Sequence, residues 1–203
     1  MQPVLPPPSY GICWDLGDVI FSEETEVKTV DGVTDSVTLV PGIGDLLGDL
    51  ARCRIPMAIV SDTRIGACEN VLGPHGLEKC FVHRTISESL GVEKPHPAMF
   101  VSTCRALNLP PERMAMIGNH YYRDVEGANR VGMTTIWFHW NDRYPSPKVP
   151  SAADYIARDA LELAASIKDF AHRAGTCRPG ASLKPRRGLP RARLLPDLDQ
   201  FRR

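Results

Sequence analysis

A chain of 203 residues is long enough for one domain with a substantial hydrophobic core. Its 24 basic and 24 acidic side chains cancel, which excludes a uniformly basic or acidic protein. The charges are unevenly placed, because nine basic and two acidic residues follow position 172. The sequence therefore combines an acidic body with a basic tail.

Composition also bears on the cellular compartment. No stretch of the sequence approaches the ~20 apolar residues of a membrane span. Residues 1–9 lack the basic start and the apolar core of a signal peptide. The six cysteines include no C-x-x-C pair, which favours a reducing compartment over a disulfide framework. We expect a soluble cytoplasmic protein without a membrane partner.

Short, nearly continuous apolar runs predict strands that are buried on both faces. In chain order these runs are residues 10–14, 56–60, 113–117 and 134–138. Helical spacing of apolar side chains predicts helices over residues 43–50, 98–107, 125–131 and 151–171. The alternation of strands and helices predicts an α/β domain with a doubly wound parallel sheet.

Two parts of the chain depart from this alternation. Residues 23–39 have the pattern of a β-hairpin around an Asp31-Gly32 turn, and they follow the first strand directly, where they could form a flap. The end of the chain is rich in Pro, Arg and Gly and has weak periodicity, which favours disorder. We therefore expect a flexible N-terminus over residues 1–9, an α/β domain over 10–172 and a basic, disordered tail over 173–203.

Polar side chains follow three of the predicted strands. Asp15 follows the first strand, Ser61 follows the second, and the loop from Asn119 to Asp124 follows the third. Ligands of open parallel sheets lie outside the carboxyl ends of the strands, so these side chains are expected to converge. A helix N-cap explains Asp15 or Ser61 equally well when each is taken singly. The three strand ends together favour a functional site.

Four strings of the sequence resemble the haloacid dehalogenase-like hydrolases. They are W-D-L-G-D-V-I-F at 14–21, I-V-S-D-T at 59–63, G-V-E-K-P-H-P-A-M-F at 91–100 and I-G-N-H-Y-Y-R-D-V-E-G-A-N-R-V-G-M at 117–133. Each string is weak evidence by itself, but all four occur in family order and at family spacing. The resemblance implies a Rossmann-like sheet and phosphatase activity. A hairpin in place of a large insertion resembles the members that lack a full cap domain.

The resemblance also implies roles for individual residues. Asp15 would be the nucleophile, attacking phosphorus to form an aspartyl-phosphate that water then hydrolyses. Lys94 would neutralise the nucleophile and the transferring phosphoryl group, although a lysine is more often a solvated surface residue. Ser61 would hydrogen-bond a phosphoryl oxygen, and the backbone amides of Asp62 and Thr63 would face the phosphate.

A Mg²⁺ cofactor is the third implication of the resemblance. Its ligands would be Asp15, the Gly17 carbonyl, and Asp124 or Asn119. Asn119 replaces the first acid of the family's last string, and its amide oxygen can ligate a hard cation without adding charge. Asp124 could instead be the N-cap of a helix that begins at Val125, and one residue could serve both purposes.

Position 17 departs from the family pattern. The family places a second acid two residues after the nucleophile, where it protonates the leaving group and activates water, but Gly17 has no side chain. Acid–base catalysis is worth about 10²–10⁴-fold, so its loss predicts a slow phosphatase. With acids absent at Gly17 and Asn119, we expect the site to hold phosphate strongly and to release it slowly. Asp18 could substitute through a water molecule, although its side chain leaves the backbone in another direction.

The sequence therefore predicts a Mg²⁺-dependent phosphatase that acts on a small phosphorylated metabolite. The alternative is a catalytically silent phosphate-binding or regulatory protein, motivated by the two absent acids. Dehalogenation is disfavoured, because Lys94, Asp124 and a metal suit a phosphoryl group better than a haloacid.

The sequence leaves open whether residues 120–123 and 139–141 face the substrate or pack against the rest of the domain. The basic tail could bind nucleic acid, but a solvated extension is favoured because aromatic residues do not interleave its charges.

Overall fold

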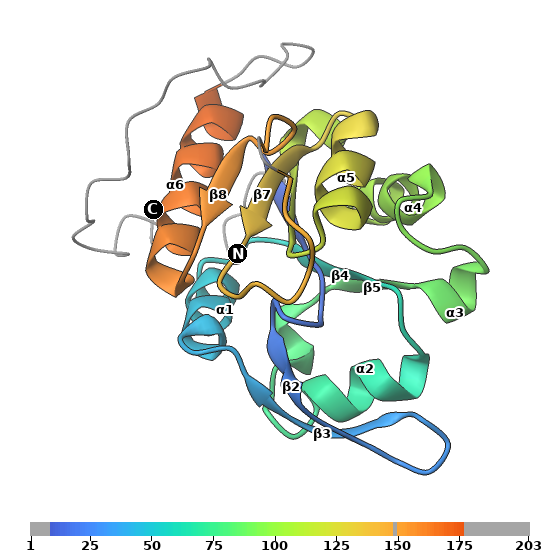
Figure 1. Cartoon of the computed structure of the whole chain (residues 1–203). Coiled ribbons are helices and arrows are strands. Elements are labelled where there is room, and N and C mark those ends of the chain that lie inside the picture. Colours follow the sequence, from blue (N-terminus) through green and yellow to red (C-terminus); the bar gives the residue numbers. More distant parts are fainter. Residues whose placement is uncertain (1–8, 148–149, 177–203) are drawn as a thin grey trace, which may run out of the picture.

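The computed structural model describes residues 9–147 and 150–176, and its centre is a six-stranded parallel sheet (Figure 1). The strand order is β5-β4-β1-β6-β7-β8. The strands are β1 (Gly11–Trp14), β4 (Met57–Ser61), β5 (His83–Ile86), β6 (Met114–Gly118), β7 (Thr134–Phe138) and β8 (Tyr155–Ala157). The doubly wound α/β sheet predicted from the sequence is confirmed. The predicted flexible residues 1–8 and the predicted tail from 177 onward lie outside the described residues.

Helices cover both faces of this sheet. They are α1 (Ile43–Arg52), α2 (Ile65–Leu72), α3 (Ser87–Leu90), α4 (Pro97–Leu107), α5 (Gly127–Arg130) and α6 (Ala160–Thr176). Short helical turns are η1 (Glu78–Cys80), η2 (Pro111–Arg113) and the π-helical turn η3 (Tyr121–Glu126). No helix in the described part of the chain is long and apolar enough to cross a membrane.

The alternation of side chains along β1 divides the core into two layers. Ile12 and Trp14 are fully buried in the cluster that includes the apolar sides of α1, α2 and α6. Cys13 points the other way, into a cluster with Met99 and Phe100 of α4. Successive side chains of a strand point to opposite faces, so a strand covered on both sides must be apolar throughout. This is why the first strand was recognisable as a continuous apolar run.

The sequence-based element prediction needs correction at the end of the domain. Residues 151–171 do not form one helix, because Tyr155–Ala157 is the edge strand β8 and α6 begins only at Ala160. The carboxylate of Asp159 accepts a hydrogen bond from the Glu162 N–H at 2.8 Å and so caps the start of α6. Strand β5 and helix α2 were also not predicted. Both missed strands are short and lie at the edges of the sheet.

The segment after β1 forms an antiparallel pair outside the main sheet. Strands β2 (Phe21–Lys28) and β3 (Thr34–Leu39) pair with each other, and Gly32 between them has a positive φ of 72°. The pair lies beside α2 (Figure 1), where the Asn70 side chain donates to the Thr34 carbonyl at 2.8 Å. The antiparallel pairing agrees with the hairpin predicted over residues 23–39. That the hairpin acts as a flap stays a prediction.

Substitution of Gly127 tests the close approach of α4 and α5. A Cβ atom at Gly127 would lie 2.9 Å from the buried Phe100 ring and from Pro95, so Gly127→Ala must displace packed groups. We expect the free energy of unfolding to fall by about 1–3 kcal/mol, as for other overpacked cores. Urea denaturation measures the change.

Gly48→Ala is the matched control within α1. Its Cβ would meet only the end of the Arg52 side chain at 3.5 Å, an ordinary contact. Alanine is a better helix former than glycine by about 1 kcal/mol, so this variant should be more stable than wild type. Equal effects of the two substitutions would contradict the packing described for Gly127.

Candidate active site

The carboxyl ends of three neighbouring strands bring the candidate residues together. Asp15 follows the central strand β1, Ser61 ends β4 on one side of it, and Asn119 follows β6 on the other side. The chain leaves β1 toward β4 and later returns to β6, so the order of strands reverses here, as it does at ligand sites of open α/β sheets. All three residues line one open cavity of ≈ 680 Å³. The convergence predicted from the sequence is confirmed.

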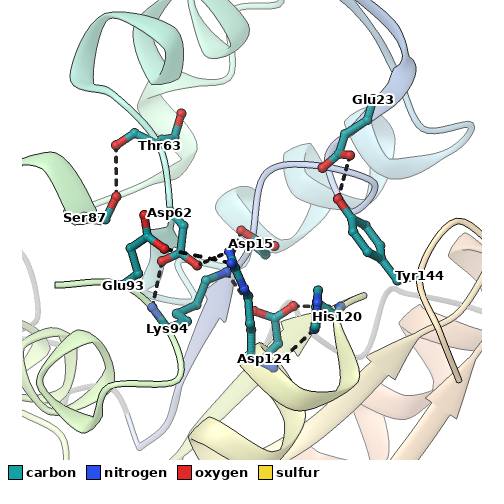
Figure 2. Close-up of polar contacts among 11 residues, drawn as sticks. Asp15, Glu23, Asp62, Thr63, Ser87, Glu93, Lys94, His120, Asp124 and Tyr144 are labelled. Atoms are coloured by element: carbon teal, nitrogen blue, oxygen red, sulfur yellow. Dashed lines mark hydrogen bonds and ion pairs between the residues drawn. The ribbon is translucent and has the colours of Figure 1, made fainter. Parts of the chain in front are cut away.

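A buried ammonium group lies at the base of this cavity. The Nζ atom of Lys94 is 2.8 Å from the Asp15 carboxylate and 2.7 Å from the Asp124 carboxylate (Figure 2). The Lys94 side chain is only 2% exposed, which excludes a solvated surface role. Burial alone would lower the pKa of Lys94, but the Asp124 and Asp15 carboxylates outweigh it and raise the pKa. Lys94 is therefore a fixed cation that touches the predicted nucleophile.

Asp124 is fully buried, and both of its carboxylate oxygens have protein partners. Oδ1 accepts from Lys94 Nζ, and Oδ2 accepts from the His120 N–H at 2.9 Å. Burial raises the pKa of Asp124 to about 7, while the Lys94 ammonium opposes the rise. Asp124 lies inside the turn η3, whose N-cap is His120, so the interpretation of Asp124 as the N-cap of the next helix is wrong.

Gly118 is needed for this placement of Asp124. A Cβ atom at Gly118 would lie 2.3 Å from the Cβ and Cγ of Asp124. Real Cβ atoms do not approach other atoms so closely, and Asp124 is fully buried with both carboxylate oxygens hydrogen-bonded. The glycine at the end of β6 thus lets the carboxylate fold back against the strand and reach Lys94.

The segment after β4 is tied to the Lys94 loop through Asp62. The Asp62 carboxylate accepts the Lys94 backbone N–H at 2.8 Å and pairs with the Arg123 guanidinium at 3.1 Å. The Thr63 carbonyl accepts a hydrogen bond from the Ser87 hydroxyl at 3.2 Å (Figure 2). Ser61, Asp62 and Thr63 all line the cavity, and their phosphate contacts remain a prediction.

The space beside Gly17 is occupied by a residue that the sequence did not single out. A Cβ atom built on Gly17 would lie 2.1 Å from Oε1 of Glu23, the third residue of β2. The other oxygen, Oε2, accepts a hydrogen bond from the Tyr144 hydroxyl at 2.7 Å, and the two side chains point toward one another (Figure 2). Burial raises the pKa of Glu23, and the Tyr144 hydrogen bond opposes the rise.

Asp18 holds the loop that carries these residues. Its carboxylate is fully buried, accepts the Glu23 N–H at 3.0 Å, and pairs with the Arg143 guanidinium at 2.6 Å. Its carbonyl accepts from the Trp140 indole at 2.7 Å, and its φ is +47°. Asp18 is not among the residues that line the cavity. The sequence-based idea that Asp18 replaces the acid missing at Gly17 is therefore not supported by its position.

The aromatic residues near the cavity divide between packing and lining. Tyr121 packs edge-on against Trp137 with ring centroids 5.2 Å apart, and His139 stacks on Trp137 with centroids 4.4 Å apart. Tyr122 is exposed beside Arg130. Of the residues left open by the sequence, His120 and Arg123 line the cavity.

Donors for a divalent cation are few but present. No cluster of three or more His, Cys, Asp or Glu side chains in the described ranges is placed to hold a metal ion. Asp15, Gly17 and Asn119 nevertheless line the cavity together, and the buried Asn119 side-chain nitrogen has no hydrogen-bond partner. A half-turn of that amide would present its oxygen instead, since the two ends are assigned from their partners.

These residues fit a cation that keeps several waters, as Mg²⁺ does. One carboxylate, a backbone carbonyl and an amide oxygen would come from Asp15, Gly17 and Asn119. Asp124 would act through water, because both of its oxygens already accept hydrogen bonds. The ligand set predicted from the sequence stays a prediction.

Comparison with known proteins agrees with the strings found in the sequence. The chain is similar to a glyceraldehyde 3-phosphate phosphatase of Pyrococcus furiosus, with 44% identity over 102 residues, which are 50% of this chain and 42% of that protein. It is also similar to a phosphoserine phosphatase of Thermus thermophilus, with 29% identity over 57% of this chain and 45% of that protein. The matches thus span less than half the length of these curated relatives.

Solved structures extend the likeness to the fold. A haloacid dehalogenase-type (HAD) phosphatase from Thermococcus onnurineus aligns with a TM-score of 0.56 and 27% identity, over 63% of this chain and 57% of that one. A hydrolase from Ehrlichia chaffeensis aligns with a TM-score of 0.64 over 82% of this chain and 98% of that one. At 15% identity the second match shows the fold alone. Residues 12–132, more than half of the sequence, match the family model, and this chain therefore belongs to the haloacid dehalogenase-like hydrolases.

Proposed function

We propose that this chain is a Mg²⁺-dependent phosphatase that hydrolyses a small phosphorylated metabolite through an aspartyl-phosphate on Asp15. The observation that carries the proposal is the Lys94 ammonium, buried between the carboxylates of Asp15 and Asp124 at the cavity base. A fixed cation at this place suits a phosphoryl dianion beside a carboxylate nucleophile. The names of the relatives from Pyrococcus furiosus and Thermus thermophilus support the same activity.

The chemistry follows from the charges around Asp15. A carboxylate is already deprotonated at neutral pH and attacks phosphorus without a base. Lys94 orients the Asp15 carboxylate and reduces the repulsion between it and the phosphoryl oxygens, while Asp124 holds Lys94 in place. A bound Mg²⁺ would supply further positive charge that draws the carboxylate and the phosphoryl group together. Ser61 and the amides of Asp62 and Thr63 would hold the phosphoryl oxygens.

The cavity has the size of a small-molecule site. Its volume of ≈ 680 Å³ lies within the range of ligand pockets, about 300–1,000 Å³. Glu26, Lys28 and Thr34 of the hairpin line it together with Arg64 and Arg123. We infer that these residues contact the part of the substrate beyond the phosphate.

We also infer that the protein works in the cytoplasm, as the cysteine pattern of the sequence suggests.

The second candidate is a phosphate-binding protein without catalysis. Gly17 and Asn119 motivate it, because each replaces an acid that the family uses. Without an acid at Gly17, turnover should be slow unless another group supplies the proton. Phosphate binding without phosphate release would distinguish this alternative from a phosphatase.

Asp15→Asn should abolish Mg²⁺-dependent phosphate release from 4-nitrophenyl phosphate. An amide cannot form the aspartyl-phosphate, so the rate should fall by about 10³-fold or more, as for other lost nucleophiles. Asp35→Asn is the matched control, because Asp35 is exposed on β3 and outside the cavity. A wild-type protein that binds phosphate but releases none from any ester would establish the silent alternative. Full activity in Asp15→Asn would exclude Asp15 as the nucleophile.

Lys94→Met should destabilise the fold in a pH-dependent way. Removing one partner of a buried ion pair typically costs about 3–5 kcal/mol, because the remaining charge is uncompensated. Here that charge is on Asp124, whose pKa is raised by burial. A buried carboxyl with a raised pKa binds its proton more readily in the folded state, so the loss should be smaller near pH 5 than near pH 8.

Urea denaturation of Lys94→Met at the two pH values measures this effect. The double variant Lys94→Met/Asp124→Asn removes the uncompensated charge and should lose the pH dependence. An equal loss of stability at both pH values in the single variant would contradict the pairing of Lys94 with Asp124.

A further inference from the structure

We propose that Glu23 is the acid–base residue of this site, taking the place of the acid that Gly17 does not provide. The inference rests on the proposed phosphatase function and adds a catalytic residue from outside the four strings. Glu23 would donate a proton to the ester oxygen while the Asp15–phosphorus bond forms and the bond to the leaving group breaks. It would then take a proton from the water that attacks the aspartyl-phosphate, which returns both Asp15 and Glu23 to their starting states.

The first observation is that Glu23 fills the space of the missing side chain. A Cβ atom at Gly17 would lie 2.1 Å from Oε1, 3.0 Å from Cδ and 3.1 Å from Cγ of Glu23. A side chain at position 17 and the present Glu23 carboxyl group therefore exclude one another. The carboxyl group reaches, from β2, the place where a side chain two residues after the nucleophile would start.

The second observation is that Glu23 faces the same cavity as Asp15 with one oxygen available. Glu23, Asp15 and Gly17 all line the cavity. Oε2 accepts the Tyr144 hydroxyl at 2.7 Å and lies 3.9 Å from the Arg143 guanidinium. Among the described residues, no hydrogen bond or ion pair engages Oε1, the oxygen nearest to Gly17. Oε1 is thus the atom that can carry and return a proton.

The third observation is that two separate segments hold Glu23 in this position. Its backbone N–H donates to Asp18, which the Arg143 guanidinium fixes from the segment after β7. Tyr144, from that same segment, holds the carboxyl group, and Figure 2 shows its hydroxyl directed at Glu23. Proton transfer needs a group held within hydrogen-bond reach of the reacting atoms, and this clamp restricts Glu23 to the cavity wall.

Three neighbouring aspartates are less suited to the role. Asp18 does not line the cavity. Asp124 accepts hydrogen bonds with both oxygens, and Asp62 is paired with Arg123 and the Lys94 N–H. The alternative for Glu23 itself is a purely structural role, in which it only anchors Tyr144. Glu23→Gln separates the two, because a glutamine oxygen still accepts from Tyr144 but the amide cannot transfer a proton.

The test compares two esters that differ in leaving group. Nitrophenolate leaves without a proton, whereas the alkoxide of 2-glycerophosphate needs one. In Glu23→Gln, kcat for 2-glycerophosphate should fall by about 10²–10⁴-fold. With 4-nitrophenyl phosphate, rapid-quench measurement should show a burst of nitrophenolate equal to the enzyme concentration, followed by a slow steady state, because water attack then lacks its base. Glu24→Gln, an exposed neighbour outside the cavity, is the control and should match wild type for both esters.

A reciprocal exchange provides a second readout. Gly17→Asp alone should lower activity, because its Cβ would push the end of the Glu23 side chain out of its position. In the Glu23→Ala background, where that carboxyl group is gone, adding Gly17→Asp should instead raise the rate with 2-glycerophosphate at least tenfold. This reverses the simple expectation that an acid at position 17 improves the enzyme whatever surrounds it.

The outcomes separate this inference from the function on which it rests. An active wild type whose rates on both esters are unchanged by Glu23→Gln overturns the role of Glu23 and leaves the phosphatase proposal standing. A gain of activity in Gly17→Asp with Glu23 present would also overturn it. A wild type that releases no phosphate from either ester overturns both proposals.

Discussion

The site depends on one constraint, which is that the ammonium group of Lys94 is buried and must be compensated. A cation removed from water is stable only when charged partners surround it. Asp15 follows β1 and Asp124 lies in the turn after β6, so the ion pairs join the ends of two neighbouring strands. Asp62 after β4 accepts the Lys94 backbone N–H and adds a third strand end. The ion pair that helps to compensate the Lys94 charge also fixes the Asp15 carboxylate, which lines the cavity.

A second constraint is steric and concerns the loop between β1 and β2. The absence of a side chain at Gly17 leaves room for Glu23, and the hairpin brings Glu23 into that room. The Asp18 carboxylate stabilises this loop, because it accepts the Glu23 N–H and pairs with the Arg143 guanidinium. The backbone of Asp18 has a positive φ. The space beside Gly17 is therefore filled by a residue of the hairpin. Glu23 comes from β2 and lines the same cavity as Asp15.

The pattern of apolar residues along the chain predicted the inner strands of the sheet better than its edge strands. The four inner strands are buried and mostly apolar on both faces, because helices cover the sheet on both sides, and such runs are easy to recognise in a sequence. The edge strand β8 has only three residues, and its sequence merges with the helical pattern of α6. Its identity as a strand depends on pairing with β7, which no local spacing encodes. The alternative interpretation of Asp124 as an N-cap is wrong for a similar reason, since its carboxylate accepts hydrogen bonds from Lys94 and from the His120 N–H.

By itself the sequence determined which polar residues follow which strands, and hence that Asp15, Ser61 and Asn119 meet at one edge. That inference needs only the parallel direction of the strands, which the alternation of helices and strands already implies. The tertiary structure decided what fills the space around them. Glu23 and Tyr144 are 121 positions apart and meet only because the segment after β7 folds back over the hairpin. Contacts of this kind depend on how separate elements pack, and so spacing along the chain could not reveal them.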